Sequence, residues 1–136
     1  MKTLDQIANH LEFLGYKKEI TDAKDDKDRP FLIAKHSSKY NIVGIQFDPN
    51  FIRFQISLTT EKRPTERMDE FIVGANRSAN ISQIYYDLEE GKVILRIGAV
   101  FSGDYSKESF GLFYDWFQGD VARLYSLKDY SKIFLD

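Results

Sequence analysis

Apolar residues occupy every second position through much of residues 30–59, and this alternation constrains the fold more than any other feature of the sequence. A period of two is typical of β-strands, so three segments are predicted to be strands: FLIAKH, NIVGIQF and FIRFQISLT. Polar loops separate them, which favours an antiparallel meander. Because only one face of such a sheet is apolar, we expect helices on one side of it.

The loops also predict how the three strands pair. A four-residue turn at residues 48–51, with Pro49 fixing its first bend, would give the facing pairs Phe47–Ile52, Ile45–Phe54 and Val43–Ile56. A similar loop at residues 37–40 would give the pairs Leu32–Ile45 and Ala34–Val43. This register would make one face of the meander continuously apolar.

A second β-ribbon is predicted in the stretch YYDLEEGKVILRIGAVF, residues 85–101. With a turn at residues 89–92, the expected pairs are Leu88–Val93, Tyr86–Leu95 and Ile84–Ile97. A slip by one residue would set Arg96 opposite Ile84 and destroy the apolar face, so this register is well specified. The reverse face would carry an amphipathic strip: Gln83, Tyr85, Asp87, Ile94 and Arg96.

Three helices are predicted around these strands. The first has Thr3 and Gln6 as a capping box and ends at Gly15; a short strand candidate follows at residues 16–20. The second opens at Pro64 and Thr65, with apolar residues at helical spacing to Ala75, and is expected to lie across the meander. The third is expected from the N-cap Ser106 to about Tyr125.

The third helix carries more apolar residues than one packing face needs. Its predicted core stripe is Phe110, Phe113, Phe117, Val121 and Leu124. Leu112, Tyr114 and Trp116 lie off that stripe, which is typical of a helix that packs against two neighbours. One of those neighbours could be another chain. Gly111 and Gly119 weaken the helix or indicate a close backbone contact.

The chain length of 136 residues predicts a single α+β domain over residues 1–136. The tail at residues 126–136 is expected either to be flexible or to dock through Ile133, Phe134 and Leu135 on its own domain or on a neighbouring molecule. Of the two docked states, docking on its own domain is favoured.

Composition narrows the function classes. The absence of cysteine excludes disulfides and fits a reducing compartment, so we expect a cytoplasmic protein. Neither a signal peptide nor an apolar run of spanning length is apparent, and no membrane association is expected. The formal net charge of -2 offers no electrostatic reason to expect nucleic acid as a partner. An aromatic content of 15% indicates either an aromatic-rich core or rings that face a partner.

Candidate chemistry is sparse, and no cofactor, metal site or catalytic set is expected. His10 is expected at the helix surface, and His36 beside Ser37 and Ser38 would need a distorted turn to form a nucleophile–base pair. Glu89 and Glu90 are expected to be solvated turn residues. The acidic loop with aspartates at 22, 25, 26 and 28 lacks the glycine and the final glutamate of a calcium-binding loop.

The order of elements resembles the YbjN-type bacterial sensory transduction regulator family, which shares the fold of type III secretion chaperones. At residue level the resemblance covers residues 68–100, where a helix ends at residues 76–80 and IYYDL, EEGK and VILR follow. These motifs are structural, so the resemblance carries over no catalytic residue. It implies an α+β fold in which an antiparallel sheet, made of the meander and the C-terminal hairpin, packs with three helices.

Two functions are therefore expected. The first is a non-enzymatic adaptor, chaperone-like protein or regulator that binds another polypeptide and forms a homodimer. Its interface residues would be Leu112, Trp116, Tyr85, Ile94 and Arg96. The alternative is a small-molecule or lipid carrier with a cavity lined by Phe47, Phe54, Tyr86 and Phe113. Against the interface interpretation, the rings could simply pack between sheet and helix. An enzyme is the third candidate, and no residue is expected to carry catalysis.

Overall fold

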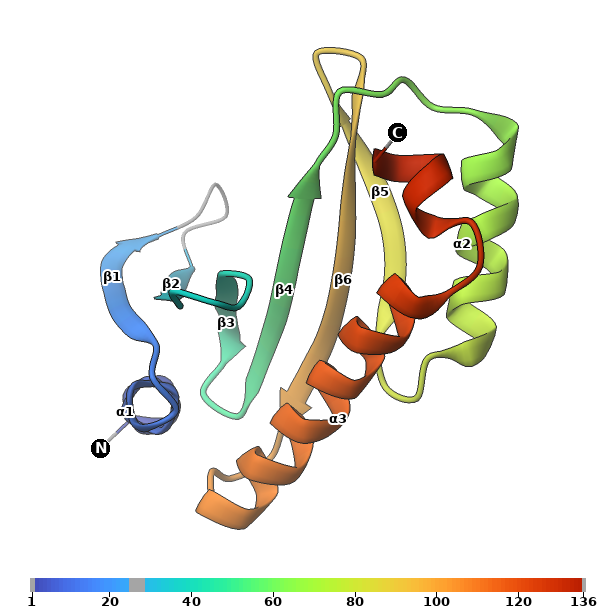
Figure 1. The fold of residues 1–136 in the computed structure, drawn as a ribbon. Helices are drawn as coiled ribbons and strands as arrows, with labels where there is room; N and C mark the ends of the chain where they lie inside the picture. Colours follow the sequence, from blue (N-terminus) through green and yellow to red (C-terminus); the bar gives the residue numbers. More distant parts are fainter. Residues whose placement is uncertain (1, 25–28, 136) are drawn as a thin grey trace. The chain divides into compact units, whose positions relative to one another are not determined.

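The computed structural model describes residues 2–24 and 29–135, and it confirms the predicted α+β class (Figure 1). Helices and strands follow one another as α1 (Thr3–Phe13), β1 (Lys17–Lys24), β2 (Pro30–Lys35), β3 (Ile42–Asp48), β4 (Phe51–Thr59), α2 (Glu66–Ser78), β5 (Gln83–Glu89), β6 (Lys92–Ser102), α3 (Lys107–Ser126) and the short π-helix η1 (Ser131–Leu135). The strands form an antiparallel sheet in the order β1-β2-β3-β4-β6-β5.

The chain divides into two compact units, and each is described by itself. The first unit contains Met1–Ile56 and Val100–Phe113, and the second contains Ser57–Ala99 and Tyr114–Asp136. Strands β4 and β6 and helix α3 each contribute residues to both units.

In the first unit, α1 packs on β1 and β2 through a stripe that includes Leu4, Ile7 and Leu11, all of them buried. The predicted capping box is wrong: Lys2 is the N-cap and makes no side-chain cap bond. Gly15 ends the helix as predicted, because its φ of 98° suits glycine and its N–H bonds the Glu12 carbonyl.

Strand β1 begins near the predicted position but continues to Lys24, into the segment that was expected to be a loop. It pairs with β2 and thereby adds a fourth strand beside the three of the meander. The calcium-loop interpretation concerned aspartates of which Asp25, Asp26 and Asp28 lie outside the described residues.

The predicted register of the meander is wrong by one residue. Leu32 pairs with Gly44 and not Ile45, and Gly44 in turn pairs with Phe54. A register shift between Gln46 and Asp48 replaces the simple four-residue turn that was assumed. Ile42 and Gly44 therefore face the core, whereas Phe47 is exposed.

The reason for this register lies in the missing side chain of Gly44. A methyl group at that position would lie 2.9 Å from Cε1 of Phe54, so the ring of Phe54 occupies the space that any other residue would fill. Phe54 also packs on Phe110 and Phe113, with ring centroids 5.7 and 5.4 Å apart. Phe101 completes this aromatic cluster, which forms the core of the first unit.

In the second unit, the β5–β6 hairpin has the predicted register, with Ile84 opposite Ile97 and Tyr86 opposite Leu95. Its turn residues Glu90 and Gly91 have φ values of 54° and 78°, as a two-residue turn of this kind requires. The hairpin therefore follows from turn chemistry and apolar pattern together.

Helix α2 begins at the predicted site, where the side chain of Thr65 accepts a hydrogen bond from the Met68 N–H. Within the second unit, the neighbours of α2 are β5 and η1 (Figure 1). The strands of the meander belong mostly to the first unit, so the expectation that α2 lies across them stays a prediction. Phe71 of α2 packs against Tyr130 and Phe134, with centroids 6.0 and 5.3 Å apart. The tail thus docks on its own chain through Phe134, which is 2% exposed.

Helix α3 has the predicted N-terminus, since Ser106 and Ser109 each bond the other's backbone N–H through their hydroxyls. It runs without interruption to Ser126 despite Gly111 and Gly119. Most of the predicted stripe is buried, whereas Phe113 is half-buried and Tyr114, placed off the stripe, is buried.

Candidate interaction surface

Helix α3 presents two large apolar side chains to solvent. Leu112 is 61% exposed and Trp116 is 48% exposed. Residues four positions apart in a helix lie on the same face, one turn from each other. The pair is therefore available for contact with another molecule, whereas Tyr114, at 8% exposure, is part of the core.

The residues of the predicted hairpin strip lie in the expected cross-strand positions, but they differ in accessibility. Tyr85 faces Arg96, and both are half-buried; Arg96 also forms an ion pair with Asp87. Ile94 pairs with Asp87 and is only 5% exposed, so it offers little surface to a partner.

The structure does not bring this strip and Trp116 into one surface. Ile84 lies with Leu124 and Asp120 around a small space beneath α3. Because neighbouring side chains in a strand alternate between faces, Tyr85 points to the side of the hairpin opposite α3. The predicted interface residues therefore belong to two separate surfaces, one on α3 and one on the hairpin.

Of the residues proposed for a ligand cavity, Phe47, Phe54 and Phe113 belong to the first unit and Tyr86 belongs to the second. Phe54 and Phe113 are in direct contact and fill the core of the first unit. Phe47 packs edge-on against Phe51, and the guanidinium of Arg29 lies 4.1 Å from the ring centroid of Phe47. The hydroxyl of Tyr86 donates to Asp69 at 2.8 Å, which raises the pKa of the tyrosine.

His10 has a defined environment in the first unit. Its Nδ1 lies 2.9 Å from the hydroxyl of Tyr105, and its ring packs edge-on against Phe110. Burial lowers the pKa of His10, and the positive charge of Lys107 lowers it further. His10, Tyr105 and Lys107 line an open groove of about 340 Å³ that also includes Phe13, which is 81% exposed.

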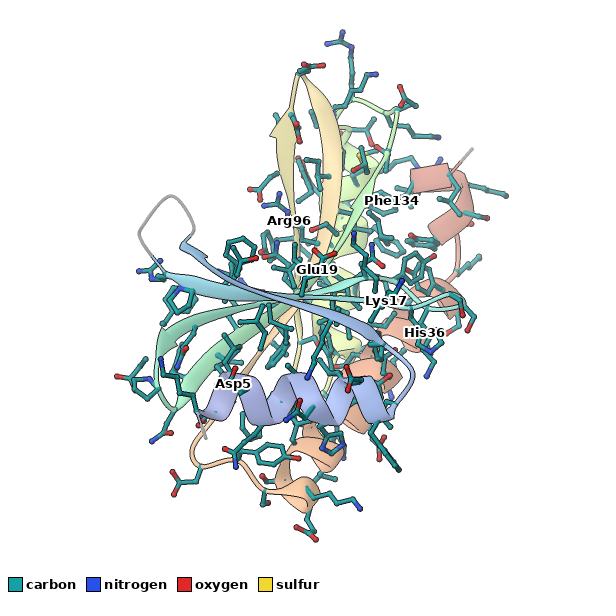
Figure 2. The ribbon with its side chains drawn as sticks, turned by 90° about the vertical axis from the view of Figure 1, so that its left-hand side faces the viewer. Asp5, Lys17, Glu19, His36, Arg96 and Phe134 are labelled. Carbon is teal, nitrogen blue, oxygen red and sulfur yellow. The ribbon has the colours of Figure 1, made fainter. Side chains whose placement is uncertain are left out.

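His36 contacts a serine hydroxyl, but the arrangement serves a turn. The Nδ1 of His36 lies 3.2 Å from Ser38 Oγ and accepts the backbone N–H of Ser38 at 3.0 Å. The lone pair that a general base needs is thus already used by the backbone. His36 (Figure 2) also packs against Tyr16, which indicates a structural role.

Within residues 2–24 and 29–135, no group of three histidine, aspartate or glutamate side chains is placed to hold a metal ion. In the same residues, no helix is both long enough and apolar enough to cross a membrane.

One carboxylate of the second unit with several hydrogen bonds was not identified from the sequence. Asp120, 2% exposed, accepts three successive backbone N–H groups, those of Asn80, Ile81 and Ser82, at 2.8 to 3.0 Å. The position of Asp120 on the apolar stripe of α3 could have identified it, because a buried acidic residue requires hydrogen-bond donors.

Comparison with known proteins supports the fold. No family model and no curated protein sequence matches the chain. Among solved structures, YbjN from E. coli, for which a role as a transcription regulator has been suggested, superposes with a TM-score of 0.67. The match covers 89% of this chain and 87% of the E. coli chain, at 14% sequence identity. This chain has the YbjN-type fold.

Three side chains stabilise the join between α2 and β5 in this YbjN-type fold, the region on which the sequence resemblance rested. Asn76 pairs with the backbone of Ile84: its Oδ1 accepts the N–H at 2.8 Å and its Nδ2 donates to the carbonyl at 2.7 Å. Asp120 binds the loop between them, and Arg123 bridges Asp120 and the Ser78 carbonyl. The join is therefore a folding device.

Proposed function

We propose that this protein is a non-enzymatic adaptor or regulator that binds other polypeptides and forms a homodimer in the cytoplasm. The observation that carries the proposal is the exposure of Leu112 and Trp116 on one face of α3. The regulatory role suggested for E. coli YbjN, which shares the fold, supports it in general terms.

The chemistry of the α3 face suits a protein partner. Tryptophan is enriched among the residues that dominate binding energy at protein interfaces, because its large ring loses much water-exposed area at a small entropic cost. Leu112 adds aliphatic surface one turn away. The half-buried pair Tyr85 and Arg96 forms a second surface on the hairpin, to which the buried Ile94 contributes little exposed area.

The test is the mass in solution, measured by light scattering after size exclusion at several concentrations. We expect a particle of two 15.9 kDa chains that becomes a monomer when Trp116→Glu places a charge in the interface. Gln118→Glu, which adds the same charge to the same helix at a half-buried position, is the control and should remain a dimer.

Circular dichroism must show that the Trp116→Glu variant is folded. An unfolded variant would place Trp116 in the core and contradict its assignment to the interface. If the wild-type protein has the mass of a monomer at every concentration, the proposed homodimer is wrong.

A further inference from the structure

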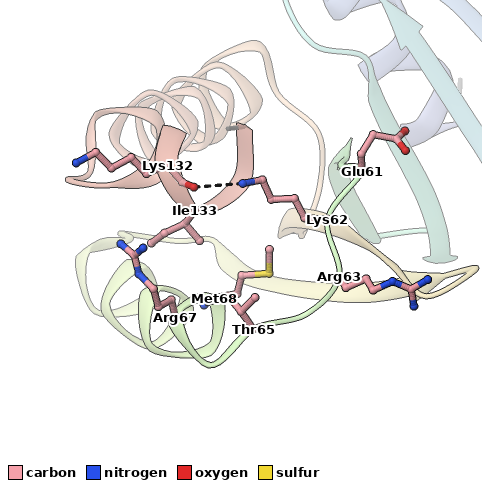
Figure 3. Close-up of a pocket in the computed structure, with 8 residues that line it drawn as sticks. All are labelled: Glu61, Lys62, Arg63, Thr65, Arg67, Met68, Lys132 and Ile133. Atoms are coloured by element: carbon pink, nitrogen blue, oxygen red, sulfur yellow. Dashed lines mark hydrogen bonds between the residues drawn. The ribbon is translucent and has the colours of Figure 1, made fainter.

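The second unit contains an open groove of about 600 Å³ between the segment that precedes α2 and the C-terminal π-helix η1 (Figure 3). Met68 lies at its base and is fully buried, and Ile133 of η1 forms an apolar wall. Figure 3 shows these two side chains between Arg67 on one side and Lys62 on the other. The groove thus has an apolar centre and a charged rim.

The rim is strongly basic although the whole chain has a formal net charge of -2. Four basic side chains line the groove: Lys62, Arg63, Arg67 and Lys132. Glu61 is the acidic residue among the lining residues, and its carboxylate lies 2.6 Å from Lys92 Nζ. The positive charge of the rim is therefore poorly compensated from within the groove.

Three of these cations are free to engage a ligand. In the part of the chain that the structure describes, Arg63, Arg67 and Lys132 form no ion pair, and all three are exposed. Like charges gathered around one groove repel one another, and an anionic ligand would relieve that repulsion. The charge pattern thus favours an acidic occupant.

The wall of the groove is held in place by the packed tail. Tyr130 and Phe134, on either side of the groove residues of η1, are buried and pack on Phe71. Lys62 Nζ also donates to the Lys132 carbonyl at 3.3 Å and links the two sides of the groove. A site formed in advance costs less ordering entropy when it binds.

We propose that this groove binds an acidic segment of a partner protein, with an aspartate or glutamate on the rim cations and an aliphatic side chain over Met68 and Ile133. Arginine pairs with carboxylates through two parallel hydrogen bonds, which suits Arg67 to this role. The lining residues include no aromatic ring, so the groove lacks the stacking platforms that single-stranded nucleic acid uses. The inference rests on the proposed function only in taking the partner to be a polypeptide.

The probe is a fluorescein-labelled peptide in which aspartate and glutamate flank two leucines. Its binding to the full chain is measured by fluorescence anisotropy. A peptide with lysine in place of the acidic residues is the matched control ligand. We expect the acidic peptide to bind at least about tenfold more tightly than the basic one. Its affinity should fall as salt screens the rim charges.

Variants locate the binding. Arg67→Glu and Lys132→Glu should each lower the affinity for the acidic peptide about tenfold or more, because each replaces an attraction by a repulsion. Arg77→Glu is the matched control: it makes the same charge change at an exposed position of α2 outside the groove lining, and it should leave affinity within about twofold.

Equal binding of the two peptides, or an equal loss of affinity in Arg77→Glu, would overturn the proposal. So would displacement of the acidic peptide by a short single-stranded DNA at lower concentration, since that would assign the groove to nucleic acid. The Trp116→Glu variant tests this inference independently of the proposed dimer, because the monomeric variant should bind the acidic peptide as tightly as the wild type does. Loss of peptide binding in that variant would overturn the assignment to the groove.

Discussion

The carboxylate of Asp120 accepts the backbone N–H of Ile81 at 2.9 Å, and it binds the N–H groups on either side of it as well. A single side chain of α3 thus satisfies three backbone donors of the α2–β5 loop. Burial by itself would raise the pKa of this carboxyl, but the hydrogen bonds from residues 80–82 outweigh it and hold the pKa below its ordinary value of 3.8.

We predict that Asp120→Asn lowers the free energy of unfolding by about 2 kcal/mol at neutral pH, because the amide turns a donor toward backbone N–H groups. Urea unfolding measures this change. Asp115→Asn, at an exposed position of the same helix, is the control and should change stability by less than about 0.5 kcal/mol.

The same carboxylate predicts a pH dependence. Since its pKa is lowered in the folded state, its contribution is fully present above the unfolded value and is lost as the pH falls through the folded value. The stability difference between wild type and Asp120→Asn should therefore shrink in acid, below about pH 4. A difference that stays constant down to the acid transition would contradict this account.

Gly44→Ala should destabilise the first unit by about 1–3 kcal/mol, because its methyl group would meet the buried ring of Phe54. The measurement is urea unfolding of the single variants and of Gly44→Ala combined with Phe54→Leu. Removal of the ring should relieve the clash, so the cost of the alanine should be smaller in the Phe54→Leu background. Equal costs in both backgrounds would show that Phe54 does not set the register.

Phe134→Ala should cost about 3 kcal/mol if the tail stays docked, because it removes a buried ring that packs against Phe71. Unfolding in urea and limited proteolysis of the C-terminus would detect the loss. Leu135→Ala, at a neighbouring position that is 66% exposed, is the control and should behave like the wild type. Equal effects of the two changes would contradict the docking of Phe134.

The lowered pKa of His10 predicts that the free energy of unfolding falls as the pH drops below the unfolded value of 6.5, because protonation is harder in the folded state. Lys107→Gln removes the second cause of the shift and should raise the pKa of His10, which NMR titration of its Hε1 signal measures. Lys17→Gln removes an exposed charge from β1 and serves as control. A pKa of His10 that is equally high in all three proteins would refute this electrostatic assignment.

The alternation of apolar residues, the turn residues Glu90 and Gly91, and the caps Thr65 and Ser106 were enough to predict most helices and the hairpin register. These features act between residues that are close in sequence, so each is visible in a short stretch of the chain. The resemblance between residues 68–100 and the YbjN-type family also led to the correct fold.

Other features were decided only by tertiary structure. The meander register depends on the fit of Phe54 over Gly44, and the α2–β5 loop depends on Asp120, which lies 38 to 40 positions away in the sequence. The basic groove likewise requires Lys132 to be brought beside Arg67 by the docking of the tail. Local pattern determined which elements form, whereas packing of distant side chains determined their register and the sites they create, because steric fit and burial exist only once the chain has folded.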